Sequence, residues 1–356
     1  MTTALVEIDD VHVHFAPRKR GLAAARAVDG VSLQLMPGEI VALVGESGCG
    51  KTTLARSLLG LVAPTAGTIS INGVPLRGKR ALRDVRRRTG LIFQDPMGAL
   101  NPRRTVVQAV TEGLEVHGVD GDHRQMAVEM LNRCGLRPAE RFLDLYPHEL
   151  SGGQRQRVVI AGAMVLRPTL LIADEPVSSL DASVRGEVLA LLLDLARTDG
   201  VTMMIVTHDL GLAWNIADRV AVMYLGKIVE LGTTEALLGP GLHTADPATD
   251  PAPPGPGSPL VSHHHPYTQA LLAAIPSADR PIAAALGGEP PDPTKIAEGC
   301  RFNPRCPSLL GGNAERLGVA ALCVTNEPQL LLGCACWVQQ AQVGTLGGTA
   351  EPTSDR

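Results

Sequence analysis

The strongest constraint on the fold is a short apolar run that leads straight into a glycine-rich octapeptide. Residues 40–44 read Ile-Val-Ala-Leu-Val, and residues 45–52 read Gly-Glu-Ser-Gly-Cys-Gly-Lys-Thr. An uninterrupted apolar run of this length is typical of a strand that is buried on both faces. The spacing of Gly, Lys and Thr after it is typical of a loop that wraps a phosphate group. The sequence therefore predicts a strand, a phosphate-binding loop and a helix over about residues 51–61.

The residue types of this loop fit the chemistry of nucleotide phosphates. Glycines allow successive backbone N–H groups to curl around a β-phosphate, and the helix N-terminus adds partial positive charge. Lys51 can reach the β- and γ-phosphates, and the Thr52 hydroxyl can bind Mg²⁺. We therefore expect ATP and Mg²⁺ as cofactors, with ATP contacting Gly45, Glu46, Ser47, Gly48, Cys49, Gly50, Lys51, Thr52 and Thr53.

A second apolar run, residues 170–173, ends in two acidic residues. Because the ends of parallel strands meet at one edge of a sheet, Asp174 would lie beside the phosphate loop, where Mg²⁺ is held. The adjacent Glu175 would be placed to polarise the water that attacks the γ-phosphate. A single acid often only caps a strand. Two acids in a chain with a phosphate loop indicate a hydrolytic site.

The remaining pattern predicts an α/β fold with a mainly parallel sheet. Residues 5–15 alternate between apolar and polar side chains, as in an antiparallel strand, and residues 203–207 read as another buried strand. Residues 97–157 lack strand patterns and predict a helical subdomain inserted into a nucleotide-binding domain of residues 1–238. Beyond it, residues 239–264 predict a Pro- and Gly-rich linker or insertion, residues 265–338 a small Cys- and Pro-rich module, and residues 339–356 a disordered tail.

Composition argues against several other classes of protein. The net charge of −4 over 356 residues gives no electrostatic case for a nucleic-acid partner. No run approaches the roughly 20 apolar residues that span a bilayer, so no transmembrane segment is expected. The first ten residues lack the basic region and apolar stretch of a signal peptide. We therefore expect a cytoplasmic protein that reaches a membrane only through partners.

One further segment names a family. Residues 150–157, Leu-Ser-Gly-Gly-Gln-Arg-Gln-Arg, resemble the signature sequence of ABC ATPases. The resemblance implies a P-loop NTPase fold, with a RecA-like parallel sheet core, an antiparallel N-terminal β region and an inserted helical subdomain. It also implies that ATP is sandwiched between two subunits. The signature residues Ser151, Gly152, Gly153 and Gln154 would then act in trans, on the γ-phosphate held by the partner subunit.

Other elements of the family follow in order. By resemblance, Gln94 belongs to the Q-loop and would touch Mg²⁺ or the attacking water, and Asp181 belongs to the D-loop. His208 resembles the switch histidine, which contacts the γ-phosphate and orients the catalytic Glu175. Phe15 is the candidate for the aromatic residue that stacks on adenine, with Val28 as the alternative near the same place.

Three stretches narrow the resemblance to the peptide/nickel importer ATPases, namely residues 93–103, 223–230 and 265–272. The phosphate loop and residues 175–181 look more like the F-type subunit of the paired oligopeptide or dipeptide ATPases than its D-type mate. The implied partners are a D-type ATPase subunit, two transmembrane permease subunits and an extracytoplasmic substrate-binding protein at the inner membrane. Import of nickel or another small solute is the first alternative. The weaker alternatives are an exporter ATPase and a soluble ABC ATPase with no transport role.

Five of the seven cysteines crowd into the last sixth of the chain. Cys300 and Cys306, in Cys-Arg-Phe-Asn-Pro-Arg-Cys, resemble the start of a motif that holds a [4Fe–4S] cluster in some of these importers. Cys323 continues that motif and Cys336 would end it, with Cys334 as a spare. Four thiolates suit either an iron–sulfur cluster or Zn²⁺. The usual C-x₂₋₄-C pairs of zinc sites are absent, which favours iron–sulfur, and free cysteines without metal remain the third possibility.

Overall fold

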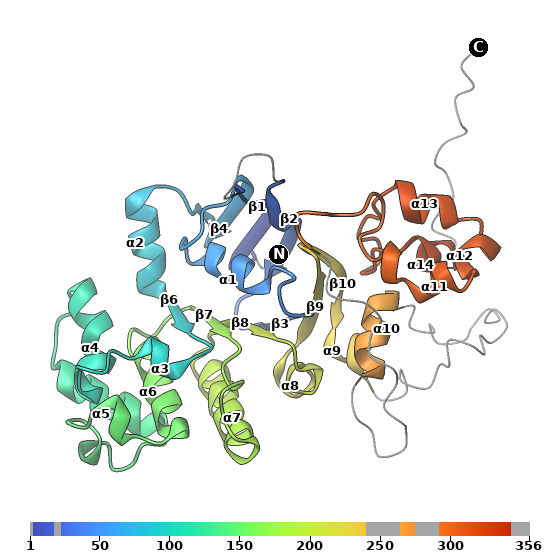
Figure 1. Cartoon of the computed structure of the whole chain (residues 1–356). Coiled ribbons are helices and arrows are strands. Elements are labelled where there is room, and N and C mark those ends of the chain that lie inside the picture. The colour runs from blue at the N-terminus through green and yellow to red at the C-terminus, as the bar shows by residue number, and fades with distance from the viewer. Residues whose placement is uncertain (1–2, 18–22, 240–263, 275–291, 343–356) are drawn as a thin grey trace.

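The computed structural model describes residues 3–17, 23–239, 264–274 and 292–342. Two sheets and the helices around them make up the part that precedes residue 240 (Figure 1). The strands are β1 (Val6–Phe15), β2 (Ala25–Leu35), β3 (Ile40–Val44), β4 (Ala66–Ile71), β5 (Val74–Pro75), β6 (Thr89–Ile92), β7 (Leu170–Asp174), β8 (Thr202–Thr207), β9 (Arg219–Tyr224) and β10 (Lys227–Thr233). Helices α1 (Lys51–Leu58), α2 (Gly78–Arg88), α7 (Ala182–Asp199), α8 (Leu210–Ile216) and α9 (Thr234–Leu238) connect or follow them.

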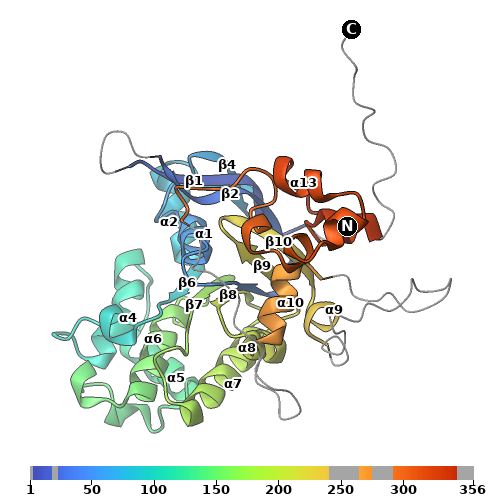
Figure 2. The same cartoon turned by 45° about the vertical axis from the view of Figure 1, so that its right-hand side comes forward.

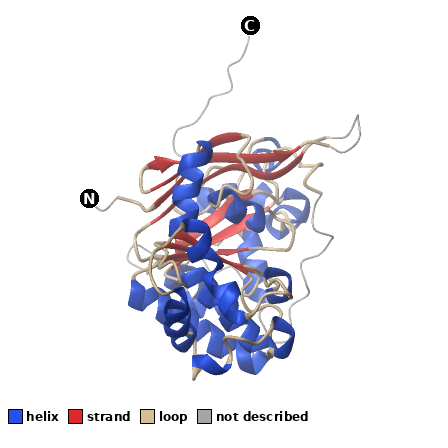
Figure 3. Cartoon of the chain, turned by 90° about the vertical axis from the view of Figure 1, so that its left-hand side faces the viewer, coloured by secondary structure: helices blue, strands red, loops and turns tan. Residues whose placement is uncertain are grey.

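The larger sheet has the strand order β10-β9-β3-β8-β7-β6 and is parallel except at the β9–β10 pair. The smaller sheet, β2-β1-β4-β5, is antiparallel. Figure 3 shows the two sheets as separate layers, with most helices on the far side of the larger one. The predicted α/β class, parallel core and antiparallel N-terminal region are confirmed.

Strand β3 shows why the central strands are apolar throughout. Ile40, Ala42 and Val44 face the core on the helical side, whereas Val41 and Leu43 face the core between the two sheets, where α1 also lies. Every residue of β3, β7 and β8 is buried. These strands do not alternate between apolar and polar residues, because both faces of the sheet are covered.

Helices fill the chain between β6 and β7. They are α3 (Pro96–Ala99), α4 (Val106–His117), α5 (His123–Arg133), the short 3₁₀ turns η1 (Ala139–Arg141) and η2 (Pro147–Glu149), and α6 (Gly152–Met164). They gather at the β6 end of the larger sheet (Figure 1). Helix α6 continues past residue 157, the expected end of the helical subdomain, because its second half packs into the main core through residues such as Ile160 and Met164.

The C-terminal elements lie at the opposite, β10 end of the sheet (Figures 1 and 2). They are α10 (Pro266–Ala273), η4 (Asn303–Arg305), α11 (Pro307–Leu310), α12 (Asn313–Arg316), α13 (Ala320–Thr325) and α14 (Trp337–Gln342). Backbone hydrogen bonds tie them to β10, one from Leu231 N to Gly333 O (2.8 Å) and one from Ala335 N to Val229 O (2.9 Å). Among the described residues, no helix is long and apolar enough to cross a bilayer.

One expected boundary is wrong. A disordered tail was expected from Gln339, but α14 runs on to Gln342, and Gln339 and Gln340 are buried. The Gln340 amide donates to the Gln329 carbonyl (2.8 Å), and this hydrogen bond offsets the cost of burying a polar side chain. The remainder of the expected tail, 343–356, and most of the expected linker, 240–263, lie outside the described residues.

Candidate nucleotide-hydrolysis site

The carboxyl ends of four neighbouring strands bring the expected site residues together. The phosphate loop follows β3, Asp174 ends β7 and Glu175 follows it, His208 follows β8, and Gln94 follows β6. In the sheet these strands lie in the order β3, β8, β7, β6. This edge of a parallel sheet is where ligands bind in α/β folds.

The phosphate loop depends on glycine at two points of close approach. Gly45 has φ 153° and Gly50 has φ 111°. A Cβ atom would lie 2.2 Å from the Met223 carbonyl oxygen at Gly45, and 1.9 Å from the Ala27 carbonyl oxygen at Gly50. Neither position can hold a side chain, so the neighbouring backbone fixes the shape of the loop.

Lys51 is buried and turned back onto this loop. Its ammonium group donates to the backbone carbonyls of Gly45 (2.7 Å) and Glu46 (2.8 Å). The next residue, Thr52, donates its hydroxyl hydrogen to Asp174 (3.1 Å). Burial raises the pKa of Asp174, and this hydrogen bond opposes the rise. Thr52 and Asp174, two of the three residues predicted to bind Mg²⁺, therefore lie within hydrogen-bonding distance of each other.

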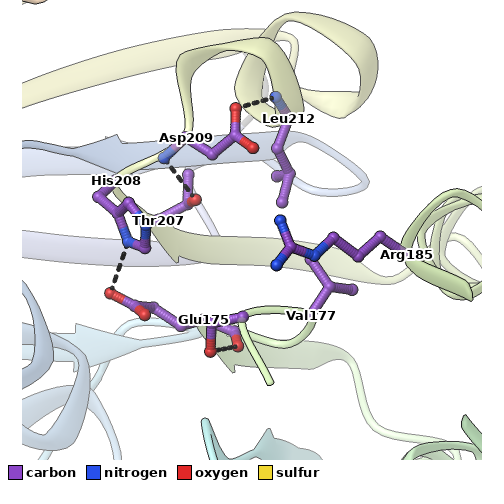
Figure 4. A pocket seen from close by; sticks show the side chains of 8 residues that line it. Glu175, Val177, Arg185, Thr207, His208, Asp209 and Leu212 are labelled. Carbon is purple, nitrogen blue, oxygen red and sulfur yellow. Dashed lines mark hydrogen bonds and ion pairs between the residues drawn. The ribbon is translucent and has the colours of Figure 1, made fainter. Parts of the chain in front are cut away.

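Glu175 is held from both sides. Its carboxylate accepts a hydrogen bond from the Gln94 amide (3.0 Å) and lies 3.1 Å from Nδ1 of His208 (Figure 4). The backbone has φ 47°, an unusual left-handed conformation for a non-glycine residue, and its N–H donates to the Val206 carbonyl (2.9 Å). Such strain at a strand end is typical of a functional position.

A pocket of about 60 Å³ opens beside this carboxylate, and its lining includes residues that the sequence analysis did not predict for the site, among them Arg185. Glu175, Thr207, His208 and Asp209 line it together with Arg185 of α7 (Figure 4). Arg185 donates to the Leu180 carbonyl (2.8 Å). It belongs to no recognised motif, and only the packing of α7 beside β7 and β8 reveals its place.

The signature residues lie elsewhere, at the start of α6. The Ser151 hydroxyl accepts from the Gln154 N–H (3.3 Å), and the Gln154 side chain accepts from the Ser151 N–H (2.9 Å), a reciprocal capping box. Ser151 and Asp181 are exposed. No hydrogen bond between the described residues joins Ser151, Gly152 or Gly153 to the phosphate loop of the same chain.

The two candidates for stacking on adenine differ sharply in exposure. Phe15, at the end of β1, is 46% exposed, whereas Val28 is fully buried in the core between the sheets. Only the Phe15 ring is therefore available to a ligand.

The five C-terminal cysteines lie close together and carry no disulfide. Burial raises the pKa of the Cys300 thiol to about 12, and neighbouring Cys306 and Cys323 add to the rise. Burial likewise raises the pKa of Cys336 to about 12, with contributions from Cys300 and Cys306. In the described part of the chain, no three of these sulfurs come within 4.8 Å of one another, the spacing that a single ion needs.

His12, His14 and Asp29 are the described residues whose potential metal-binding atoms do meet that spacing. Asp29, however, is already engaged by Arg301 as well as by both histidines. Burial alone would raise the pKa of Asp29, but the hydrogen bonds from Arg301 and the histidines outweigh it and lower the pKa. A carboxylate already paired with a buried guanidinium is a poor ligand for a cation.

Comparison with known families agrees with this geometry. The ABC transporter family matches residues 28–178, and the family "Oligopeptide/dipeptide transporter, C-terminal region" matches residues 260–310. The probable peptide ABC transporter ATP-binding protein y4tS of Sinorhizobium fredii is 41% identical over 86% of this chain and 83% of its own length. The oligopeptide transport ATP-binding protein OppF of Salmonella typhimurium is 40% identical over 85% of this chain and 88% of its own length.

Similarity to solved structures supports the same family assignment. A dimeric structure of the ATP-binding cassette MJ0796 bound to ADP and Pi superposes with a TM-score of 0.58 at 30% identity, over 64% of this chain and 98% of the other. The fold and strand-end site thus define an ABC-type ATPase. The chain belongs to the ATP-binding subunits of ABC transporters, in the oligopeptide/dipeptide transporter family.

Proposed function

We propose that this subunit drives the import of di- or oligopeptides, coupling ATP hydrolysis to membrane partners. The observation that carries the proposal is the pairing of a complete strand-end ATPase site with a C-terminal region of the oligopeptide/dipeptide transporter type. Relatives named for peptide transport support it. Uptake of nickel or another small solute by the same machinery is the alternative outcome of its test.

The residues divide the chemistry between them. The loop amides and Lys51 bind the phosphates, and the Phe15 ring stacks on adenine. Thr52, Asp174 and Gln94 would hold Mg²⁺, which would supply positive charge that offsets the negative charge of the phosphate oxygens. Glu175 accepts a proton from the attacking water, because both its oxygens are oriented by Gln94 and His208.

Each site is completed by a second ATPase subunit. The exposed Ser151, with Gly152, Gly153 and Gln154, covers the γ-phosphate held by the partner, and Asp181 lies at the same interface. The exposure of the α6 N-terminus and the dimeric form of a structurally similar cassette support this arrangement. This chain takes the F-type position beside a D-type mate, two permease subunits and a substrate-binding protein, at the cytoplasmic face of the inner membrane.

The C-terminal cysteines would hold a [4Fe–4S] cluster, and its bonds to the thiolates would cross-link this part of the fold. Cys300 lies near Cys306 and Cys323, Cys336 lies near Cys300 and Cys306, and the Cys300 N–H donates to the Cys323 carbonyl (2.9 Å). A single Zn²⁺ binds sulfurs at about 2.3 Å and needs them closer together than they lie. A cluster binds each thiolate through a different iron, so more widely spaced thiols suit it.

Transport by a reconstituted complex tests the peptide assignment. The chain, its mate and its permeases would be placed in proteoliposomes with the substrate-binding protein, and ATP-dependent uptake of a mixed tri- to pentapeptide pool would be compared with uptake of Ni²⁺. Peptide uptake that disappears with Glu175→Gln supports the proposal. Nickel uptake without peptide uptake would replace it with the alternative.

A further inference from the structure

We propose that two residues from the C-terminal part of the chain, Arg305 and Tyr267, are positioning residues for the phosphate loop. Both act on Glu46, the second residue of that loop, and thereby help to set the affinity for ATP. The proposal concerns ATP binding alone and does not depend on which solute is transported.

Three contacts fix Glu46 at once. Its backbone N–H donates to the Tyr267 hydroxyl (2.7 Å). Its two carboxylate oxygens accept from the two terminal nitrogens of Arg305 (2.8 and 3.0 Å), which makes a bidentate salt bridge. The arginine side chain in this pair is only 8% exposed. Its carbonyl accepts from Lys51 (2.8 Å). The residue that orients the phosphate-binding lysine is therefore itself clamped by the C-terminal region.

Arg305 and Tyr267, which we call the Glu46 clamp, are themselves held in place by buried contacts. Tyr267 packs in a buried aromatic group with Tyr224 and Phe302, whose ring centroids lie 4.6 and 5.5 Å from its own. Tyr224 ends β9, and the Arg305 guanidinium lies over its ring. Arg301, four residues earlier, donates to the Leu225 carbonyl (2.6 Å) and pairs with Asp29 of β2. The segment that carries Arg305 is thus anchored both to β9, the neighbour of β3 in the larger sheet, and to β2 of the smaller sheet.

Charge gives the clamp a second effect. Glu46 places a carboxylate in a loop whose ligand is a polyphosphate, and an unpaired negative charge there would repel ATP. Arg305 neutralises it, because an arginine is charged at any physiological pH, and the hydrogen bond to Glu46 raises the pKa of Arg305 further. Two-pronged arginine–carboxylate pairs also fix orientation, which a lysine would not do.

The test is ATP affinity, measured on the full-length chain by displacement of a fluorescent ATP analogue, alongside KM and kcat of the assembled ATPase. Arg305→Gln should weaken ATP binding and raise KM by about tenfold, the size of a coupling between contacting residues, with kcat changed less than twofold. Tyr267→Phe, which removes only the hydroxyl, should give about a threefold loss. Arg316→Gln, an exposed arginine of α12, is the matched control and should change nothing.

A double variant separates the clamp from general loss of structure. In a Glu46→Gln background, Arg305→Gln should have less than a twofold effect, because the pair is already broken. An undiminished tenfold effect there would show that Arg305 acts by another route and would overturn the proposal. Affinities of Arg305→Gln and Tyr267→Phe within twofold of the Arg316→Gln control would also overturn it. If Arg305→Gln fails to fold by near-UV circular dichroism, the Tyr267→Phe result decides.

Discussion

The strand-end site and the C-terminal cysteine region are built in different ways. In the first, side chains at the ends of parallel strands join two hydrogen-bonded sets, Thr52 with Asp174, and Glu175 with Gln94 and His208. In the second, Cys306 precedes α11 and Cys323 lies in α13, helices of four and six residues that are too short to be stable alone. The fold itself assembles the ATPase site, and we expect the cysteine region to need further cross-links to hold its shape.

The largest effect expected is on chemistry at the strand ends. Glu175→Gln keeps the shape and the neighbours of the side chain but cannot take a proton, so ATPase activity should fall by at least about 100-fold. ATP binding should persist, and the ATP-bound dimer should accumulate on gel filtration. Val177→Ala, in the same pocket, is a control with no proton to transfer. Near-normal turnover in Glu175→Gln would remove the role assigned to this carboxylate.

The comparison predicts that the cysteine region depends on its metal for stability. Cys306→Ala should abolish the brown colour and the iron and sulfide content of anaerobically purified protein. It should also lower the free energy of unfolding by about 3 kcal/mol, because a lost metal link is among the costliest changes. Cys334→Ala, at an equally buried thiol in the same region, is the control and should retain iron. Colourless parent protein with stoichiometric zinc would instead indicate a Cys₄ zinc site, and parent protein free of both metals yet stable would refute the prediction.

A smaller effect should appear with pH at the start of α10. His265 is fully buried, and burial lowers the pKa of its imidazole to about 3. Below about pH 6.5 His265 is protonated in the unfolded chain but stays neutral in the folded chain. The free energy of unfolding should therefore fall as the pH drops from 6.5 toward 3. The slope is at most about 1.4 kcal/mol per pH unit.

His265→Asn isolates that contribution. Asparagine can still cap the helix, as the Nδ1 atom of His265 does for the Tyr267 N–H, but it does not titrate. Urea unfolding between pH 7 and 5 should show a shallower dependence in the variant than in the parent protein. Equal slopes would mean that His265 becomes protonated inside the fold.

Sequence patterns predicted the strand-end site because each of its parts is local. The loop at 45–52, the acids after β7 and His208 after β8 all follow buried apolar runs, and parallel strands must end at the same edge. The clamp on Glu46 could not be predicted from the sequence, because its contacts join residues 221 and 259 positions apart. The end of α14 was missed because Gln339 and Gln340 are polar in sequence, yet both are buried, and Gln340 donates hydrogen bonds to the carbonyls of Gln329 and Cys334.

The central claim is that this chain carries half of a shared ATPase site, and a titration tests it most directly. With this chain fixed at a low concentration, ATPase activity should be slow alone and should rise saturably as the D-type mate is added. Lys51→Ala in this chain should abolish the activity at its own site, and Ser151→Arg should abolish the activity of the mate's site while leaving ATP binding at Lys51 intact. A fast rate from this chain alone, unchanged across protein concentrations and unaffected by Ser151→Arg, would contradict the account.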